Sequence, residues 1–167
     1  MLGVIIKLKT WLVKALELTV ILIMGFLVVD VVWGVFTRYV LGHQSPWTEE
    51  LAKMLLIWVA LLGASVGFIR ESHLGVDYFV SKLSERWRIA GRLVVYLLTA
   101  VFASIVLIYG GYRLVSLTLE NGQPSPALNI EMGHVYLAIP ISGVFIVLFS
   151  IETLIESISL LKKRSGA

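Results

Sequence analysis

The chain has 167 residues, of which 58% are hydrophobic and only 15% are charged, and its formal net charge is +3. Soluble domains typically carry about a quarter charged residues and less than half apolar ones, so this composition predicts an integral membrane protein. Because the chain contains no cysteine, it can form neither disulfides, zinc–thiolate sites nor iron–sulfur ligation, and it has no cysteine nucleophile.

The N-terminal flank does not have the pattern of a cleavable export signal. Its basic residues are interleaved with apolar ones, and no small-residue cleavage site ends the long apolar run that follows. We therefore expect the first hydrophobic segment to be retained in the membrane.

Four segments are long and apolar enough to cross a membrane. They are residues 18–36, with Asp30 as the only charge, residues 51–69, with Lys53, and the uncharged residues 93–112 and 135–151. Each approaches the ~20 residues that a helix needs to cross ~30 Å of hydrocarbon, and none alternates in polarity as a barrel strand does. The complete helices are expected over about 15–40, 47–69, 90–119 and 132–160.

Charges gather where the first two segments meet. The connection over residues 41–46 is short, so an antiparallel hairpin should bring Arg38 close to Glu49 and Glu50. Ser45 is the expected N-cap of the second helix and Pro46 its first residue, which puts both glutamates in the first turn. Glu49 and Lys53 form an i,i+4 pair. Two interpretations are open: a headgroup-level anchor, with Trp47 as its aromatic part, or a contact site for a partner protein.

Asp30 lies eight residues below Arg38, or about 12 Å at helical rise. A carboxylate at that depth is costly and usually faces protein rather than lipid. Lys53 enters from the neighbouring helix and is expected to reach toward it. A proton or ion relay and a buried polar contact are both compatible with the sequence, and a single acid favours the contact.

The connection over residues 70–92 is too charged to span. Apolar residues recur there at steps of three or four, which predicts an amphipathic helix over about 76–88. We expect this helix to lie along the cytoplasmic interface, with a soluble helix packed on a partner as the alternative.

The distribution of cations predicts the orientation. Eleven of the fourteen Lys and Arg residues lie in the N-terminal flank, the 70–92 connection and the C-terminal tail, whereas residues 41–47 and 121–134 contain none. The positive-inside rule then places both termini in the cytoplasm, as four spans also require. The sequence thus predicts an all-α membrane protein that forms one domain over residues 1–167, with four transmembrane helices and one cytoplasmic-side interfacial helix.

No catalytic or cofactor-binding pattern is visible. His43 and His134 are expected outside and His73 inside, so no pair of histidines faces across the membrane to hold a haem. The chain has no H-E-x-x-H motif, no phosphate loop and no nucleic-acid signal. We expect neither an enzyme nor a protein with a metal or another cofactor.

Two stretches resemble one family of membrane proteins. RYVLGHQSPWTEELAKMLLIWVALLGASVGFIRESHLGVDYF, residues 38–79, is similar to the signature of the small membrane subunit (Q subunit, DctQ-like) of tripartite ATP-independent periplasmic (TRAP) transporters. SPALNIEMGHVYLAIPISGVFIVL, residues 125–148, resembles the family's last span. The matching positions of the first stretch are Arg38, Tyr39, Ser45, Trp47, Glu49, Glu50, Leu62, Gly63, Ala64, Arg70, His73, Val76 and Asp77.

The resemblance implies a scaffold in the bacterial inner membrane. It would form a heterodimer with a large, elevator-type subunit that carries an organic acid, such as a C4-dicarboxylate or a sialic acid, together with sodium ions. A periplasmic binding protein would deliver the substrate and dock transiently. Small residues such as Gly63, Ala64 and Gly67 would allow close packing on the large subunit. Arg70, His73 and Asp77 would fix the turn into the interfacial helix.

The alternative from another class is a self-sufficient small four-helix transporter that couples to protons through Asp30. Such transporters are shorter than this chain, and their antiparallel dimers need loops with balanced charge, unlike the strong bias seen here. An assembly or regulatory protein without transport activity is the third possibility. The substrate itself is not encoded in these residues.

Overall fold

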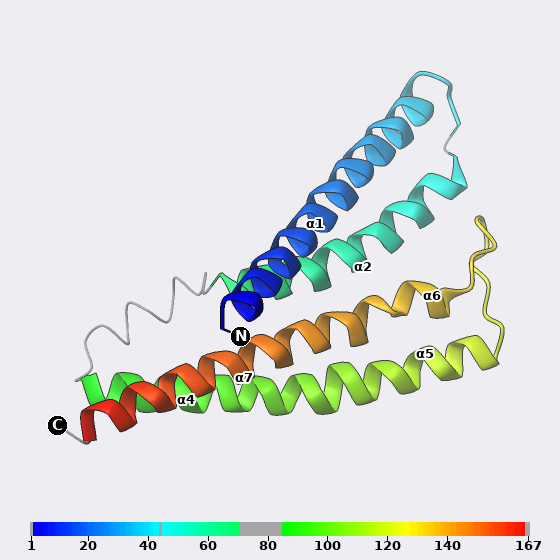
Figure 1. Ribbon diagram of the computed structural model, residues 1–167. Coiled ribbons are helices and arrows are strands. Elements are labelled where there is room, and N and C mark those ends of the chain that lie inside the picture. Colours follow the sequence, from blue (N-terminus) through cyan, green and yellow to red (C-terminus); the bar gives the residue numbers. More distant parts are fainter. Residues whose placement is uncertain (1, 44, 71–84, 166–167) are drawn as a thin grey trace.

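The computed structural model describes residues 2–43, 45–70 and 85–165 of the chain (Figure 1). The expected interfacial helix over 76–88 therefore falls largely outside the described residues, as do the predicted site residues His73 and Asp77. Residues 85–88 are described, and they form the beginning of helix α4.

The described helices are α1 (Leu2–Tyr39), α2 (Pro46–Ile69), α4 (Glu85–Phe102), the π-helical segment η1 (Ala103–Gly110), α5 (Gly111–Glu120), α6 (Met132–Tyr136) and α7 (Ala138–Ser165). α4, η1 and α5 follow one another directly and form one long rod. Four helical stretches are long and apolar enough to cross a membrane: Lys9–Tyr39, Pro46–Ile69, Leu93–Glu120 and Met132–Ile155. The predicted all-α membrane fold with four spanning helices is therefore confirmed.

α1 and α2 form an antiparallel hairpin, as the short connection predicts. Gly42, at a φ of 75°, lies in the turn, where a glycine adopts this left-handed conformation at little cost. Ser45 occupies the N-cap position, but its side chain makes no capping hydrogen bond. Its carbonyl oxygen instead accepts hydrogen bonds from the Thr48 amide at 3.2 Å and the Thr48 hydroxyl at 2.8 Å.

The α4–η1–α5 rod and the α6–α7 pair form the second hairpin. Gly111, Gly133 and Gly143 lie where the two halves approach closely, because a Cβ atom at any of these positions would meet neighbouring atoms at 2.8 Å or less. Residues of one helix therefore pack against the bare backbone of the other, an arrangement that small residues permit between membrane helices.

α2 and α7 join the two hairpins. The Ser65 hydroxyl donates to the carbonyl oxygen of Leu61 at 3.0 Å and lies 3.3 Å from that of Ser142 on α7. Nearer the chain termini, Phe68, Tyr96 and Phe149 form a buried aromatic cluster, with the Phe68 and Tyr96 rings edge to face. Figure 1 shows the hairpins meeting at this end and diverging toward the end with the 121–131 loop.

Much of the apolar surface is not covered by the chain itself. Only 6% of the most apolar window of the first span is buried, and 28% of that of the fourth. Large side chains such as Phe26 and Val29 on α1 are 68% exposed. Surfaces of this kind are suited to contact with lipid or with another membrane protein.

Candidate functional site

Glu50 joins the two hairpins at the end where they diverge. Its two carboxylate oxygens accept hydrogen bonds from the Ala127 amide at 3.0 and 2.9 Å, and one of them also accepts from the Leu128 amide at 3.1 Å. Hydrogen bonds to a charged acceptor are stronger than neutral ones. We call this contact between α2 and the 121–131 loop the outer clasp.

The fold of the 121–131 loop presents these two amides to Glu50. Gly122 turns the chain out of α5 at a φ of 54°, and an isolated antiparallel bridge pairs Pro124 with Glu131. The Ser125 amide donates to Ile130 at 2.9 Å and the Asn129 amide to Ser125 at 3.0 Å, which closes a small turn around residues 126–128. Asn129 adopts a φ of 55°, which asparagine tolerates better than most residues. This turn is therefore the element that receives Glu50.

The structure also describes the other charged and aromatic residues predicted near the α1–α2 connection. The Lys53 ammonium donates to the Glu49 carboxylate at 2.8 Å, so the i,i+4 pair is confirmed, and both side chains are more than half exposed. The Arg38 guanidinium lies 5.9 Å from the ring centroid of Tyr39. Trp47 is 40% exposed at the beginning of α2. An ion pair between Arg38 and the glutamates remains a prediction.

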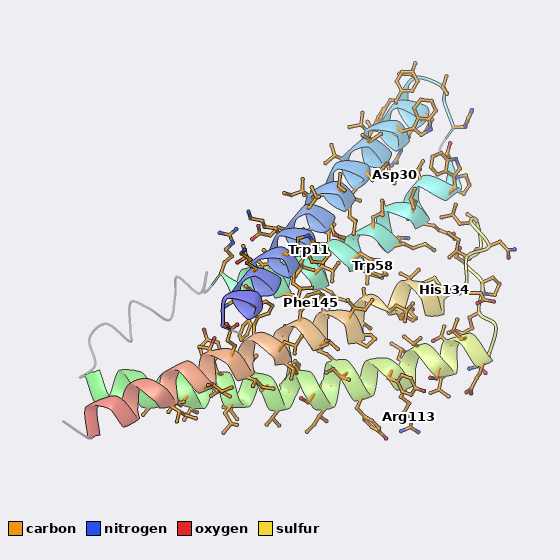
Figure 2. All side chains as sticks on the ribbon, viewed as in Figure 1. Trp11, Asp30, Trp58, Arg113, His134 and Phe145 are labelled. Atoms are coloured by element: carbon orange, nitrogen blue, oxygen red, sulfur yellow. The ribbon has the colours of Figure 1, made fainter. Side chains whose placement is uncertain are left out.

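Asp30 lies in the half of α1 nearer the 40–45 connection (Figure 2). It is 6% exposed, and neither carboxyl oxygen has a hydrogen-bond partner among the described residues. The expectation that Lys53 reaches toward Asp30 is wrong, because the Lys53 ammonium bonds Glu49 on its own helix instead. Thr37 and Thr48, the other buried polar residues of this region, bond backbone carbonyls within their own segments.

A second set of contacts joins the helices at the opposite end. The Arg70 guanidinium donates to the Glu17 carboxylate of α1 at 2.6 Å, and the Lys9 ammonium donates to Glu152 of α7 at 2.6 Å. These pairs tie α1 to α2 and to α7. Arg70 was expected to act with His73 and Asp77, which lie outside the described residues, and its described partner is Glu17.

Sequence reasoning missed Glu17 and the loop amides. Glu17 carried a usable signal, since it is an acid in a basic flank at the membrane level expected for Arg70. The amides of Ala127 and Leu128 carried none, because every residue except proline has such a donor. Within the described part of the chain, no group of three or more His, Cys, Asp or Glu side chains is arranged to hold a metal ion.

The chain is similar to known proteins over most of its length. A family model described as "Tripartite ATP-independent periplasmic transporters, DctQ component" matches residues 27–160. The sialic acid TRAP transporter small permease protein SiaQ of Vibrio cholerae is 30% identical over 151 residues, which cover 87% of this chain and 82% of that protein. A putative TRAP transporter small permease protein of Haemophilus influenzae is 31% identical over 147 residues, covering 86% of this chain and 87% of that protein.

One similar protein is much longer. The sialic acid TRAP transporter permease protein SiaT of Haemophilus influenzae is 30% identical over 140 residues, which cover 83% of this chain but only 21% of that protein. In SiaT, the segment similar to this chain is therefore a minor part of a larger permease polypeptide.

Proposed function

We propose, from the premise that this chain belongs to the family of DctQ components of tripartite ATP-independent periplasmic transporters, that it acts as a scaffold for a larger permease subunit. It is a multi-pass protein of the inner membrane, and its relatives are transporter permease proteins. The proposed partner is an elevator-type subunit that carries an organic acid with sodium ions. A periplasmic binding protein would deliver the substrate and dock only transiently.

The observation that carries this proposal is the combination of a braced bundle with uncovered apolar faces. The outer clasp ties α2 to the 121–131 loop at one end, and the Arg70–Glu17 and Lys9–Glu152 pairs tie α1 to α2 and α7 at the other. The outer faces of the spans remain largely uncovered by the chain itself. Such a bundle is suited to bracing a mobile partner, and the occurrence of a similar segment within the longer SiaT supports a partner of that kind.

Co-expression with the large subunit tests the scaffold role. We expect the two chains to copurify, and we expect uptake of the organic acid to require both of them and the binding protein. The matched control is each chain alone, reconstituted at the same protein-to-lipid ratio. Solute flux by this chain in isolation would contradict the proposal.

Asp30 separates the scaffold from the self-sufficient proton-coupled transporter. We expect Asp30→Asn to keep copurification and uptake within about twofold of wild type, since the change removes no hydrogen bond to a described residue and keeps the side-chain volume. The measurement is uptake by cells that express the complete system. Abolished uptake with intact copurification would instead favour transport through Asp30.

The orientation is tested with single cysteines, because the chain contains none of its own. Gln123→Cys and Lys7→Cys replace two exposed residues at opposite ends of the bundle. If the cytoplasm holds the cations, a membrane-impermeant maleimide should label position 123 in spheroplasts and position 7 only after permeabilisation. Labelling of both positions after denaturation serves as the control, and the reverse pattern in spheroplasts would invert the topology.

A further inference from the structure

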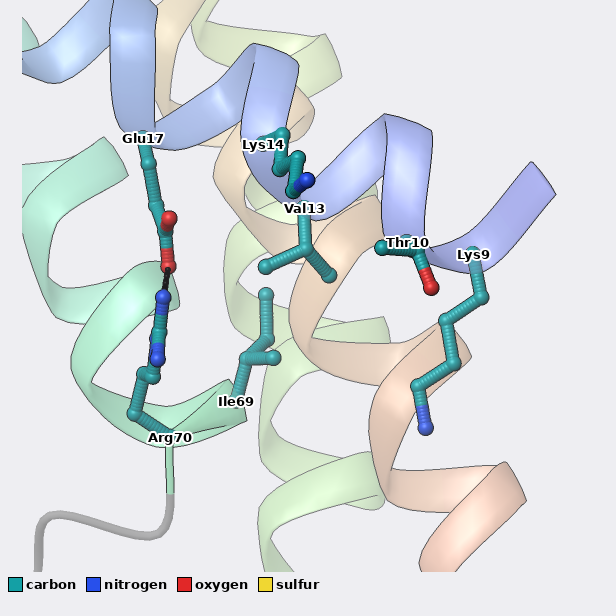
Figure 3. A pocket seen from close by; sticks show the side chains of 7 residues that line it. All are labelled: Lys9, Thr10, Val13, Lys14, Glu17, Ile69 and Arg70. Carbon is teal, nitrogen blue, oxygen red and sulfur yellow. Dashed lines mark hydrogen bonds and ion pairs between the residues drawn. The ribbon is translucent and has the colours of Figure 1, made fainter. Parts of the chain in front are cut away.

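A cavity of about 320 Å³ lies at the end of the bundle opposite the outer clasp (Figure 3). In Figure 3, Glu17 and Arg70 meet on one side, Val13 and Ile69 face each other in the middle, and Lys9 lies on the other side. The complete lining is Lys9, Thr10, Val13, Lys14, Glu17, Ile69 and Arg70. The cavity thus combines three cations, one carboxylate and one hydroxyl with an apolar centre.

Among the described residues, the charges at this cavity leave one cation in excess. Arg70 is neutralised by Glu17, and Lys9 by Glu152 of α7. Lys14 has an exposed side chain, and it forms no ion pair with any residue in the described ranges. A ligand with a single negative charge would therefore balance the cavity.

The surroundings of the cavity are suited to an amphiphile. α1 continues from the cavity toward the membrane centre with exposed apolar side chains: Leu18 is 57% exposed, Ile21 65% and Leu22 54%. Leu18 lies one helical turn, or about 6 Å, beyond Lys14. An acyl chain could follow this surface while an anionic group stays between the cations.

We propose that this cavity binds the phosphodiester of an anionic membrane phospholipid, with the phosphate at Lys14 and Arg70 and an acyl chain along α1. The Arg70 Nε atom donates to Glu17 Oε1, and Nη2 forms an ion pair with the same oxygen, which leaves further N–H groups of the guanidinium for a second acceptor. The carboxylate of Glu17 in the lining opposes free phosphate, because inorganic phosphate carries more negative charge than a phosphodiester. The proposal is independent of the scaffold role.

The test compares two variants that each remove one positive charge from α1. Lys14→Gln changes the cavity, whereas Lys7→Gln changes an exposed lysine of the same helix that does not line it. The full-length chain, purified in detergent, is titrated with phosphatidylglycerol and followed by native mass spectrometry. Parallel titrations use diacylglycerol with the same chains, which lacks the phosphate, and inorganic phosphate as a competitor.

We expect Lys14→Gln to weaken phosphatidylglycerol binding roughly three- to tenfold, as for loss of one hydrogen bond of typical strength at an exposed side chain, and Lys7→Gln to leave it unchanged. Diacylglycerol should bind much more weakly than phosphatidylglycerol. Equal effects of the two variants, or equal binding of the two lipids, would overturn the proposal. Displacement of the lipid by inorganic phosphate would make the cavity a free-phosphate site and would also overturn it.

Discussion

Replacing Glu50 with glutamine is expected to release the 121–131 loop from α2 and to lower the yield of copurified large subunit several-fold. The wild-type carboxylate accepts from two amides, those of Ala127 and Leu128, at 2.9 to 3.1 Å. Glutamine offers only one acceptor oxygen. Its NH₂ group is a donor and cannot accept a hydrogen bond from the amide of Ala127 or Leu128. One loop amide then loses its acceptor, and the charge that strengthened the remaining bond is gone.

The matched control for this change is the adjacent residue. Glu49→Gln removes the same charge from the same helical turn, but Glu49 pairs with Lys53 at a surface where both side chains are more than half exposed. Exposed pairs of this kind contribute little to stability. We therefore expect a clearly lower thermal unfolding midpoint in detergent for Glu50→Gln only. Equal effects of the two substitutions on unfolding and on copurification would show that the contact of Glu50 with the loop contributes no more than the exposed Glu49–Lys53 pair.

Adding a single methyl group at Gly143 is expected to disrupt the packing between the third and fourth spans. A Cβ atom there would lie 2.7 Å from Cβ of Leu107, 3.0 Å from a side-chain carbon of Ile108 and 3.2 Å from the Ile108 amide nitrogen. All three atoms belong to η1, and no side-chain rotation can move the Leu107 Cβ or the Ile108 nitrogen away. Overpacking of this kind typically costs about 1–3 kcal/mol, and we expect Gly143→Ala to lower the free energy of unfolding by a similar amount.

Gly25→Ala provides the control for Gly143→Ala. Gly25 lies within α1, and a Cβ atom at this position would have no neighbour within 4 Å. Alanine is favoured over glycine within a helix, so this change should be neutral or stabilise the chain by up to about 1 kcal/mol. Both free energies can be measured by denaturant titration in detergent with tryptophan fluorescence, since the chain contains five tryptophans. A stable Gly143→Ala variant would contradict the close approach of α7 to η1.

The helical spans and the first residue of α2 could be predicted from the sequence because both depend on local chemistry. An apolar run of sufficient length must form a helix in lipid, since each backbone polar group needs a partner within the segment. Pro46 begins α2 and Ser45 precedes it, as the positional preferences of these residues indicate. The Glu49–Lys53 pair follows from helix geometry alone.

The partners of the charged residues could not be predicted in this way. Glu50 bonds amides 77 and 78 residues away, Lys53 turns to Glu49 rather than to Asp30, and Arg70 bonds Glu17. Each choice depends on how far apart the helices lie and how they are rotated. The π-helical turn over Ala103–Gly110 was also unforeseen, since no residue type in that stretch marks it.

For this protein, the order of its apolar and charged segments was sufficient to determine the four spanning helices, because insertion into lipid depends on hydropathy along the chain. The family was indicated by the resemblance of residues 38–79 and 125–148 to its motifs. Only the tertiary structure decided that Glu50 holds the 121–131 loop, that Gly143 lets α7 approach η1, and that a cavity with one excess cation forms beside Arg70. These features arise between segments far apart in the chain, and their energies depend on distances that no local pattern specifies.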